Sequence, residues 1–337
     1  MQEVTKALSV GLLAAVLSPW AGHAQTAGTA ILKIDIANYV PYSYDIFDIQ
    51  KFASAPVLTP TPMLPNGGRA FTFFVFIGDI VAVNGKPAKG LWTARGTTMS
   101  FEPNAVPGHS TADLARGNII DMYWEILQSN GTPIGTIAAS GLSRGTPPPG
   151  APSAQTGDNL LITGGTGAFF GVRGQAGVIN LGSPRQASIV EDPASRRTIG
   201  GAQRSYVLHL LPLSVPEVVT TANGPAITHS SDFSLVTASK PAAAGEILSM
   251  FVTGLGPIVA AADPGQPLPT PPADVNSPVE VTVNGKAADI LGAAGYPGAV
   301  DGYQVNFRVP PETTKGAAVI QVSAAWIAGT PVRIMIQ

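Results

Sequence analysis

Three polar side chains that alternate along one predicted strand are the clearest candidates for chemistry in this sequence. Asp121, Tyr123 and Glu125 are separated by apolar residues, so all three project from the same face of the strand. If that face lines an apolar cavity, burial raises the pKa of the carboxyl groups toward the range in which a general acid or base works. If it points outward, the trio lies on the solvent-exposed face of a half-buried strand. This is the commoner arrangement in a barrel that binds apolar ligands.

Two arginines are candidates for binding the acidic group of a ligand. Arg95 lies in a predicted strand over residues 89–101, and Arg173 follows a cluster of glycines. A guanidinium group can bind a carboxylate through two parallel hydrogen bonds. The alternative role for either residue is that of a surface arginine paired with a neighbouring carboxylate.

Composition excludes several classes of site. The chain has no cysteine, which excludes disulfides, thiolate metal sites and a cysteine nucleophile. Its histidines show no metal-ligand spacing, so we expect no metal site. They are His23, His109, His209 and His229. The net charge of −2, with no basic block, leaves no electrostatic footprint for nucleic acid.

The elements that must position these residues are short strands. The chain has 337 residues, enough for two domains, and its 38 glycines and 31 prolines interrupt it at short intervals. An antiparallel succession of about eight strands predicts an up-and-down β-barrel, which removes open sheet edges by closure. The predicted strands lie at 31–36, 71–83, 89–101, 118–128, 134–139, 160–163, 174–179 and 204–211.

The glycine cluster lies between two of these strands and predicts a tight turn or bulge. Glycine accepts positive φ and a close approach of backbone, which such a turn requires. The cluster is Gly164, Gly165, Thr166 and Gly167. The order Gly-Gly-Thr-Gly-x-Phe-x-x-x-Arg-Gly resembles the signature hairpin of the dirigent and allene oxide cyclase-like barrels, and the resemblance extends over about residues 70–212.

This resemblance implies a fold and a class of activity. The fold is an eight-stranded barrel with an apolar cavity, sometimes oligomeric. Members of the family cyclise a reactive oxylipin or steer the coupling of phenolic radicals, without a cofactor. Carried over by position, the family's arginine falls on Arg173 and its strand-end aspartate on Asp79. Dirigents often have an acid after the glycine cluster, where this chain has Ala168.

The C-terminal part predicts a second all-β domain. Residues 245–257 and 302–310 resemble the Solibacter-type uncharacterised C-terminal domain, which implies an Ig-like β-sandwich in an exported protein. The predicted boundaries are a linker at 213–230 and the sandwich at 231–337. Strands are expected near 246–253, 279–283, 303–309, 317–322 and 332–336, with a hairpin at Asn284-Gly285.

The N-terminal residues predict export. Lys6 precedes an apolar run too short to span a bilayer, and small residues up to Ala24 form a cleavage site, so residues 1–24 are expected to be a signal peptide. Residues 25–69 are expected to hold one strand and an excursion rich in proline and aromatic residues. No later segment is long and apolar enough for a transmembrane helix.

Three functions are compatible with these features. The first is a non-catalytic binding or surface-associated protein whose barrel holds a small apolar or phenolic ligand, with a cell-surface or extracellular protein as a further partner. The second is a cofactor-free cyclase or isomerase that works inside the barrel. The third is a structural component of an envelope or matrix. The direction of the side chains at 121–125 distinguishes the second from the others.

Overall fold

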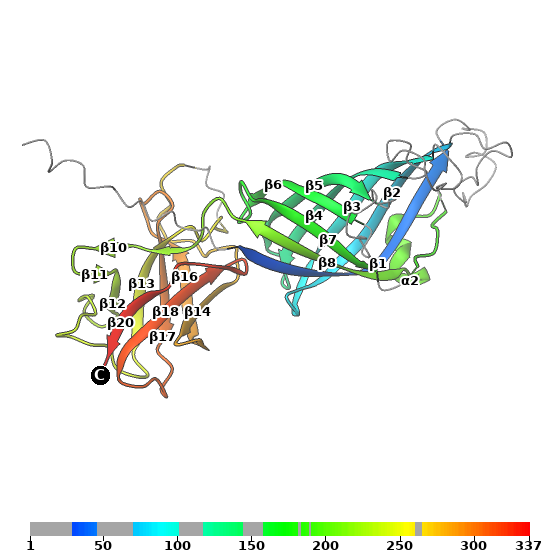
Figure 1. The fold of residues 1–337 in the computed structure, drawn as a ribbon. Helices are drawn as coiled ribbons and strands as arrows, with labels where there is room; N and C mark the ends of the chain where they lie inside the picture. The colour runs from blue at the N-terminus through cyan, green and yellow to red at the C-terminus, as the bar shows by residue number, and fades with distance from the viewer. Residues whose placement is uncertain are drawn as a thin grey trace, which may run out of the picture.

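A computed structural model describes residues 29–45, 70–100, 117–143, 158–180, 183–188, 190–259 and 265–337. The predicted signal peptide and the proline-rich part of the excursion, residues 46–69, lie outside these ranges. The described chain forms two β-rich modules, a barrel and a C-terminal module of two larger sheets (Figure 1). No helix in this part of the chain is long and apolar enough to cross a membrane.

The first module is a closed antiparallel barrel of eight strands in sequence order. The first and last strands pair with each other, with Ile34 opposite Tyr206, and this pairing closes the barrel. The strands are β1 (Ala30–Asp45), β2 (Ala70–Val83), β3 (Lys86–Ser100), β4 (Gly117–Gln128), β5 (Pro133–Ser143), β6 (Asp158–Gly167), β7 (Arg173–Asn180) and β8 (Ala202–Leu211).

Strand β1 is longer than the strand predicted over residues 31–36. It is the first strand of the barrel and continues nine residues past Ile36, to Asp45. Tyr39 was expected in the excursion and instead lies buried in the barrel core. The pairing of β1 with β2 shifts register between Ala37 and Val40, and Asn38 there has φ of 55°. This bulge lets one strand continue where simple alternation in the sequence breaks off.

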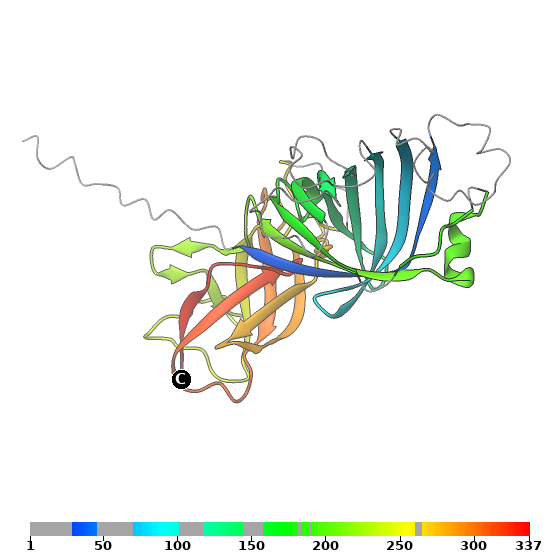
Figure 2. The ribbon, with the colours of Figure 1, turned by 45° about the vertical axis from the view of Figure 1, so that its right-hand side comes forward.

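The connections at the two ends of the barrel differ in length. At one end β2 and β3, β4 and β5, and β6 and β7 are joined by short turns. The first is Asn84-Gly85, with φ of 49° and 76°, which matches the type I′ hairpin that the dipeptide predicts. At the other end the strands are joined by much longer segments. The chain leaves β8 at the short-turn end, and the C-terminal module lies beside that end (Figure 2).

The interior of the barrel is filled by its own side chains. Trp92, Trp124 and Met122 have no surface accessible to water, and neither do Tyr206 and Leu208. The Tyr206 ring lies 5.5 Å from the ring of Trp92 and 5.2 Å from that of Trp124, centroid to centroid. A water-sized space beside these residues would leave part of their surface accessible. The barrel is therefore packed at their level, as its strand number permits.

The glycine cluster forms the end of β6 and the start of its turn. A Cβ atom at Gly165 would lie 2.4 Å from the carbonyl oxygen of Phe169, so only glycine lets the turn fold back this closely. Gly167 has φ of 61°, which favours glycine. The turn places Phe169 in the barrel core, where it is 1% exposed. The cluster itself belongs to β6, which ends at Gly167, and the turn follows it at residues 168–171.

The C-terminal module contains two larger antiparallel sheets that share one apolar core. One sheet has the order β12-β13-β17-β16 with β9 at its side, and the other has β15-β14-β18-β19 with β20; an Ig-like strand order stays a prediction. The strands are β9 (Glu217–Val218), β12 (Ile227–His229), β13 (Ile247–Thr253), β14 (Val279–Val283), β15 (Lys286–Ala287), β16 (Asp289–Gly295), β17 (Tyr303–Arg308), β18 (Gly316–Ala324), β19 (Ile327–Ala328) and β20 (Val332–Ile336).

Most of the predicted linker belongs to this module. Val218 and Ile227 are buried in its apolar core, and β9 and β12 pair with β13. Between them, β10 (Thr220–Thr221) and β11 (Gly224–Pro225) form a small hairpin. Residues 217–229 thus pair and pack with the sheets of this module.

The two modules are joined by packing as well as by the chain. Ala325 and Ile327, at the turn between β18 and β19, belong to the apolar core of the barrel. Lys86 of the first barrel hairpin pairs with Glu280 of β14. The C-terminal module therefore covers the short-turn end of the barrel.

The close approach at Gly165 predicts a specific loss of stability. Gly165→Ala is expected to lower the free energy of unfolding by about 2 kcal/mol, because the new methyl group must displace backbone at Phe169. Urea unfolding of the purified protein measures this. Gly177→Ala is the matched control, since a Cβ atom there meets nothing within 4 Å. Equal stability of the two variants would contradict the explanation.

Candidate functional site

The polar trio of β4 lies on the outer face of the barrel. Tyr123 is 45% exposed and Glu125 is also exposed, whereas Met122 and Trp124 between them face the core. The Asp121 carboxylate accepts a hydrogen bond from Ser140 at 2.8 Å. The structure does not bring these side chains into the interior. A cyclase that works inside the barrel required them to line an apolar cavity there, and they do not.

Arg95 lies beside this trio on the same outer face. Its guanidinium Nε is 3.6 Å from a carboxylate oxygen of Asp121, and its side chain is 70% exposed. An ion pair this exposed contributes less than about 1 kcal/mol. Arg95 therefore has the surroundings of a surface arginine with a carboxylate neighbour.

The interior holds a charged residue that the sequence analysis did not single out. Arg204, at the start of β8, is 3% exposed, and its guanidinium lies 4.6 Å from the centroid of the Tyr39 ring. It donates hydrogen bonds to the hydroxyl groups of Tyr206 at 3.0 Å and Tyr39 at 3.4 Å. The rings of Phe76 and Trp92 also lie within 6 Å of it. Stacking on aromatic faces stabilises a desolvated guanidinium, so Arg204 is part of the packing near the long-loop end.

Asp79 of β2 forms ion pairs with the connection between β7 and β8 and holds that connection against the barrel. This connection contains η1 (Pro193–Ser195) and α2 (Arg196–Ile199). Arg196, which is 3% exposed, and Arg197 both pair with the Asp79 carboxylate, and Asn38 donates to it at 3.2 Å. These residues occupy both carboxylate oxygens. Asp79 therefore has a local structural role, and we do not assign it to a ligand.

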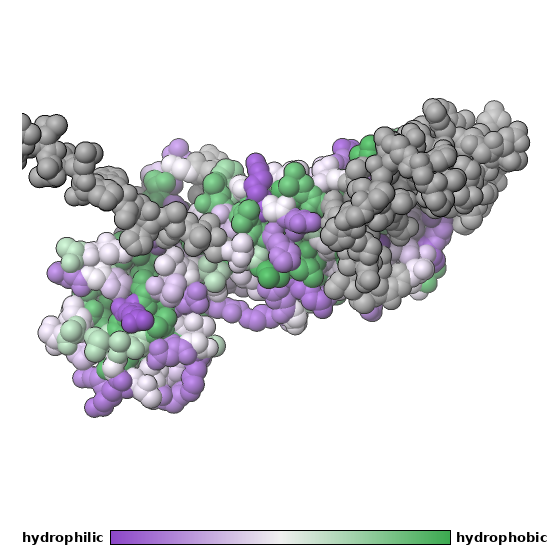
Figure 3. Space-filling model, viewed as in Figure 1, coloured by the Kyte–Doolittle hydropathy of each residue, from purple (hydrophilic) through white to green (hydrophobic). Residues whose placement is uncertain are grey.

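Arg173 borders a groove on the outer wall of the barrel, here called the Arg173 groove. The groove has a volume of about 650 Å³. Its lining includes Leu161, Arg173, Gln175, His209 and Leu211. Across the sheet Leu161 is opposite Gln175, Gln175 is opposite His209, and Arg173 is opposite Leu211. Figure 3 shows hydrophobic and hydrophilic side chains mixed over β6, β7 and β8.

The groove combines exposed apolar surface with one permanent positive charge. Leu161 is 63% exposed and Leu211 is 50% exposed, which leaves both side chains largely in water. Arg173 donates one hydrogen bond to the carbonyl oxygen of Val172 at 3.1 Å, and its guanidinium has further donors. The described residues that line the groove include no Asp or Glu. The groove can hold an apolar body and bind an acidic group at its edge.

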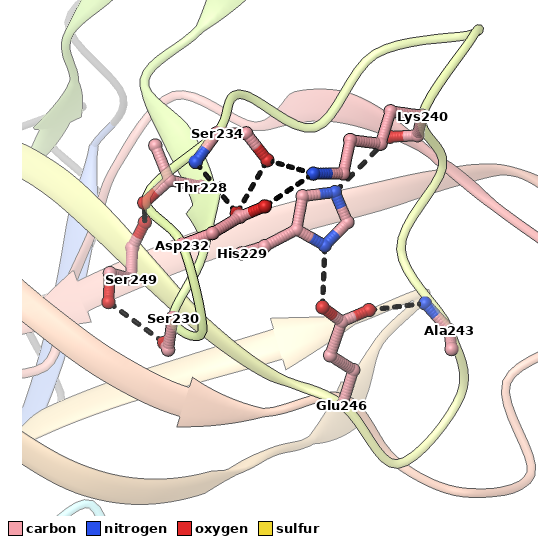
Figure 4. Close-up of polar contacts among 9 residues, drawn as sticks. All are labelled: Thr228, His229, Ser230, Asp232, Ser234, Lys240, Ala243, Glu246 and Ser249. Atoms are coloured by element: carbon pink, nitrogen blue, oxygen red, sulfur yellow. Dashed lines mark hydrogen bonds and ion pairs between the residues drawn. The ribbon is translucent and has the colours of Figure 1, made fainter.

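A second cluster of titratable residues lies in the C-terminal module (Figure 4). His229 is 5% exposed and contacts Glu246 through Nδ1 at 2.5 Å and the carbonyl oxygen of Lys240 through Nε2 at 3.3 Å. The other Glu246 oxygen accepts the N–H of Ala243 at 2.7 Å. Both ring nitrogens of the histidine are thus engaged. The cluster holds the loop between β12 and β13 against the sheet and has no open position for a substrate.

Lys240 belongs to the same loop but lies at the surface. Its ammonium group contacts Asp232 and the hydroxyl of Ser234, each within 2.6 Å. Hydrogen bonds from Lys240 and Ser234 hold the pKa of Asp232 well below its usual value. Since the carboxylate and the ammonium group pair with each other, this part of the cluster is a surface ion pair. Among the described residues, no group of three or more Asp, Glu or His side chains is placed to hold a metal ion.

Comparisons with known proteins add little to this geometry. No model of a known protein family matches the chain, and no curated protein matches it. Among solved structures, a chain described as a polysaccharide lyase aligns over 96% of this chain with 7% sequence identity and a TM-score of 0.17. This chain spans 41% of the length of that lyase. A TM-score this low carries no argument about fold or activity, and the family resemblances seen in the sequence stay predictions.

The Asp79 cluster predicts how stability depends on pH. Burial acts to raise the pKa of Asp79, but hydrogen bonds from Arg197, Asn38 and Arg196 hold it below its usual value of 3.8. A lowered carboxyl pKa stabilises the folded state above the usual pKa, and this contribution is lost as the pH falls through the folded value. Asp79→Asn is expected to lower the free energy of unfolding by about 3 kcal/mol at pH 7, since it leaves the buried Arg196 without its carboxylate.

Urea unfolding at a series of pH values tests this prediction. The difference between Asp79→Asn and the unmodified protein should shrink as the pH falls from the usual carboxyl pKa of 3.8 through the lower pKa of folded Asp79. Asp121→Asn is the control, with an expected change below about 1 kcal/mol because its ion pair is exposed. If both substitutions lowered the free energy of unfolding by a similar amount at pH 7, the Asp79 ion pairs would not stabilise the fold as proposed.

Proposed function

We propose that this protein is an exported, non-catalytic binding protein that holds a small apolar molecule with an acidic group in the Arg173 groove. The observation that carries the proposal is the position of Arg173 beside exposed leucines in a groove of about 650 Å³. Ligand sites commonly combine mainly apolar walls with a few polar groups that fix orientation. A carboxylate or phenolate on the ligand supplies the partner for Arg173.

The packed interior is the reason for placing the ligand outside the barrel. An apolar ligand inside would have to displace side chains such as Trp92, Trp124 and Tyr206, which already fill the space with no accessible surface. The outer groove needs no such rearrangement. The barrel then serves as a rigid wall, which suits a binding role because little conformational freedom is lost when a ligand is bound.

The dirigent and allene oxide cyclase-like resemblance agrees with part of this proposal. The family's arginine falls on Arg173, which is also one of the two arginines predicted to bind an acidic group, and Arg173 lines the groove. The predicted signal peptide and the Solibacter-type resemblance support an extracytoplasmic setting, where the C-terminal module would contact a cell-surface or extracellular protein. In this proposal the barrel does not use the trio at 121–125.

The affinity of the groove for acids tests the proposal. Isothermal calorimetry on the purified protein would measure the affinities for decanoate and decanol, which share a chain length and differ in charge. The affinity for 4-hydroxycinnamate, a phenolic acid, would be measured in the same way. Decanoate is expected to bind at least about tenfold more tightly than decanol, because a charge-assisted hydrogen bond to arginine contributes about 1.5–3 kcal/mol. Arg173→Met should abolish this preference while keeping the apolar part of the binding.

The matched control is Arg95→Met, which removes an exposed arginine from another part of the same barrel wall. Its affinity for decanoate should equal that of the unmodified protein. Equal binding of decanoate and decanol, or an equal loss in the two arginine variants, would refute the assignment of the groove. Mass spectrometry of the recovered ligand adds a separate check, because conversion of the ligand would favour the cyclase or isomerase function over simple binding.

A further inference from the structure

The two modules enclose a cleft at the short-turn end of the barrel, here called the inter-module cleft. It has a volume of about 400 Å³. On the barrel side it is lined by the β6–β7 turn, including Ala168 and Phe170. On the other side it is lined by segments of the C-terminal module around residues 254–258, 265–268 and 300–303. Contacts between domains are a common position for ligand sites.

The walls of the cleft are apolar and its rim is exposed. Leu255, Ile258 and Ile327 are each less than 7% exposed and form the walls. Phe170 is 72% exposed and Val300 is 54% exposed, so both stand at the rim with much of their apolar surface in water. A small molecule with an apolar body would cover this surface on binding, which is favourable.

Among the described residues that line the cleft, Asp301 is the one with a charged side chain. Its Oδ1 accepts the N–H of Gly254 at 3.2 Å, and within the described ranges no lysine or arginine forms an ion pair with it. Asp301 has φ of 54°, a conformation that aspartate and asparagine accept more readily than other side chains. The cleft therefore contains a carboxylate without a cation.

The nearby Tyr303 is uncharged and adds no second charge to the cleft. Its hydroxyl donates to the carbonyl oxygen of Gly256 at 2.6 Å. Burial, and then the nearby Asp301 carboxylate, raise the pKa of Tyr303, so the phenol stays neutral at physiological pH. The described lining of the cleft thus has one negative charge, on an exposed carboxylate beside apolar side chains.

We propose that the inter-module cleft binds a small organic cation, with an apolar or aromatic body and an ammonium group that pairs with Asp301. The ammonium group would donate to the carboxylate, as in other charge-assisted hydrogen bonds. The Phe170 ring at the rim offers an aromatic face for the cation or for an aromatic body. This site is separate from the Arg173 groove and has the opposite charge preference.

Ligand charge provides the direct test. Calorimetry on the purified full-length protein would compare phenethylamine, 2-phenylethanol and phenylacetate, which share a phenyl group and differ in charge. Phenethylamine is expected to bind at least about tenfold more tightly than phenylacetate, since one charge pairs with Asp301 and the other is repelled by it. Equal binding of all three, or tighter binding of phenylacetate, would overturn the proposal.

Asp301→Asn removes the charge and preserves the shape. Asparagine accepts the same positive φ, and its amide oxygen can still accept the Gly254 N–H, so the variant is expected to fold. It should lose about tenfold in affinity for phenethylamine and little for 2-phenylethanol. Asp289→Asn, which changes an exposed acid at the start of β16 in the same module, is the matched control and should leave both affinities unchanged.

Two further variants locate the site and separate it from the Arg173 groove. Phe170→Ser changes an exposed rim residue and should weaken all phenyl ligands that bind in the cleft. Arg173→Met should leave phenethylamine binding unchanged whether or not the groove binds acids. If Asp301→Asn and Asp289→Asn bind phenethylamine with the same affinity, the cleft is not a cation site.

Discussion

The closure of the barrel around a packed interior is the constraint on which the rest of the structure depends. Pairing between β1 and β8 removes the sheet edges and directs alternate residues of every strand inward. Large aromatic side chains then occupy the interior, with Trp92 and Trp124 in contact with Tyr206. Because side chains fill the interior at the level of these rings, both proposed binding sites lie outside it, on the outer wall and at the short-turn end.

The two ends of the barrel are stabilised in different ways. At the short-turn end the C-terminal module inserts Ala325 and Ile327 into the barrel's core, so apolar packing joins the modules. Toward the other end the connection between β7 and β8 is held by the ion pairs of Asp79 with Arg196 and Arg197. Apolar contact tolerates changes in pH, whereas the ion pairs do not, so acid is expected to loosen the barrel first near Asp79.

One turn contributes to both proposed binding sites. Gly165 and Gly167 allow the chain after β6 to fold back closely, which buries Phe169 and leaves Phe170 at the surface. Phe170 reaches the rim of the inter-module cleft, and Arg173 at the start of β7 borders the groove on the outer wall. The close packing of this turn thus fixes one residue of each site, with an anion preference on one side and a cation preference on the other.

The sequence by itself determined those features that depend on neighbouring residues. Alternation of apolar and polar residues located most strands, and those predicted at 279–283 and 332–336 match β14 and β20. The Asn-Gly pairs at 84–85 and 284–285 marked hairpins because positive φ is a local property of those residues. The glycine cluster indicated a close approach of backbone, which the structure has at the end of β6, because glycine carries no Cβ atom.

Tertiary structure decided which face of each strand is buried and which distant residues meet. The alternation at 121–125 is the same whether the trio points in or out, so barrel closure alone placed it outside. Asp79 and Arg196 are 117 positions apart, and no local pattern links them. The bulge in β1 and the short strands at 217–229 broke the periodicity on which sequence reasoning depends. Both proposed sites combine residues from separate segments, so only the fold could assemble them.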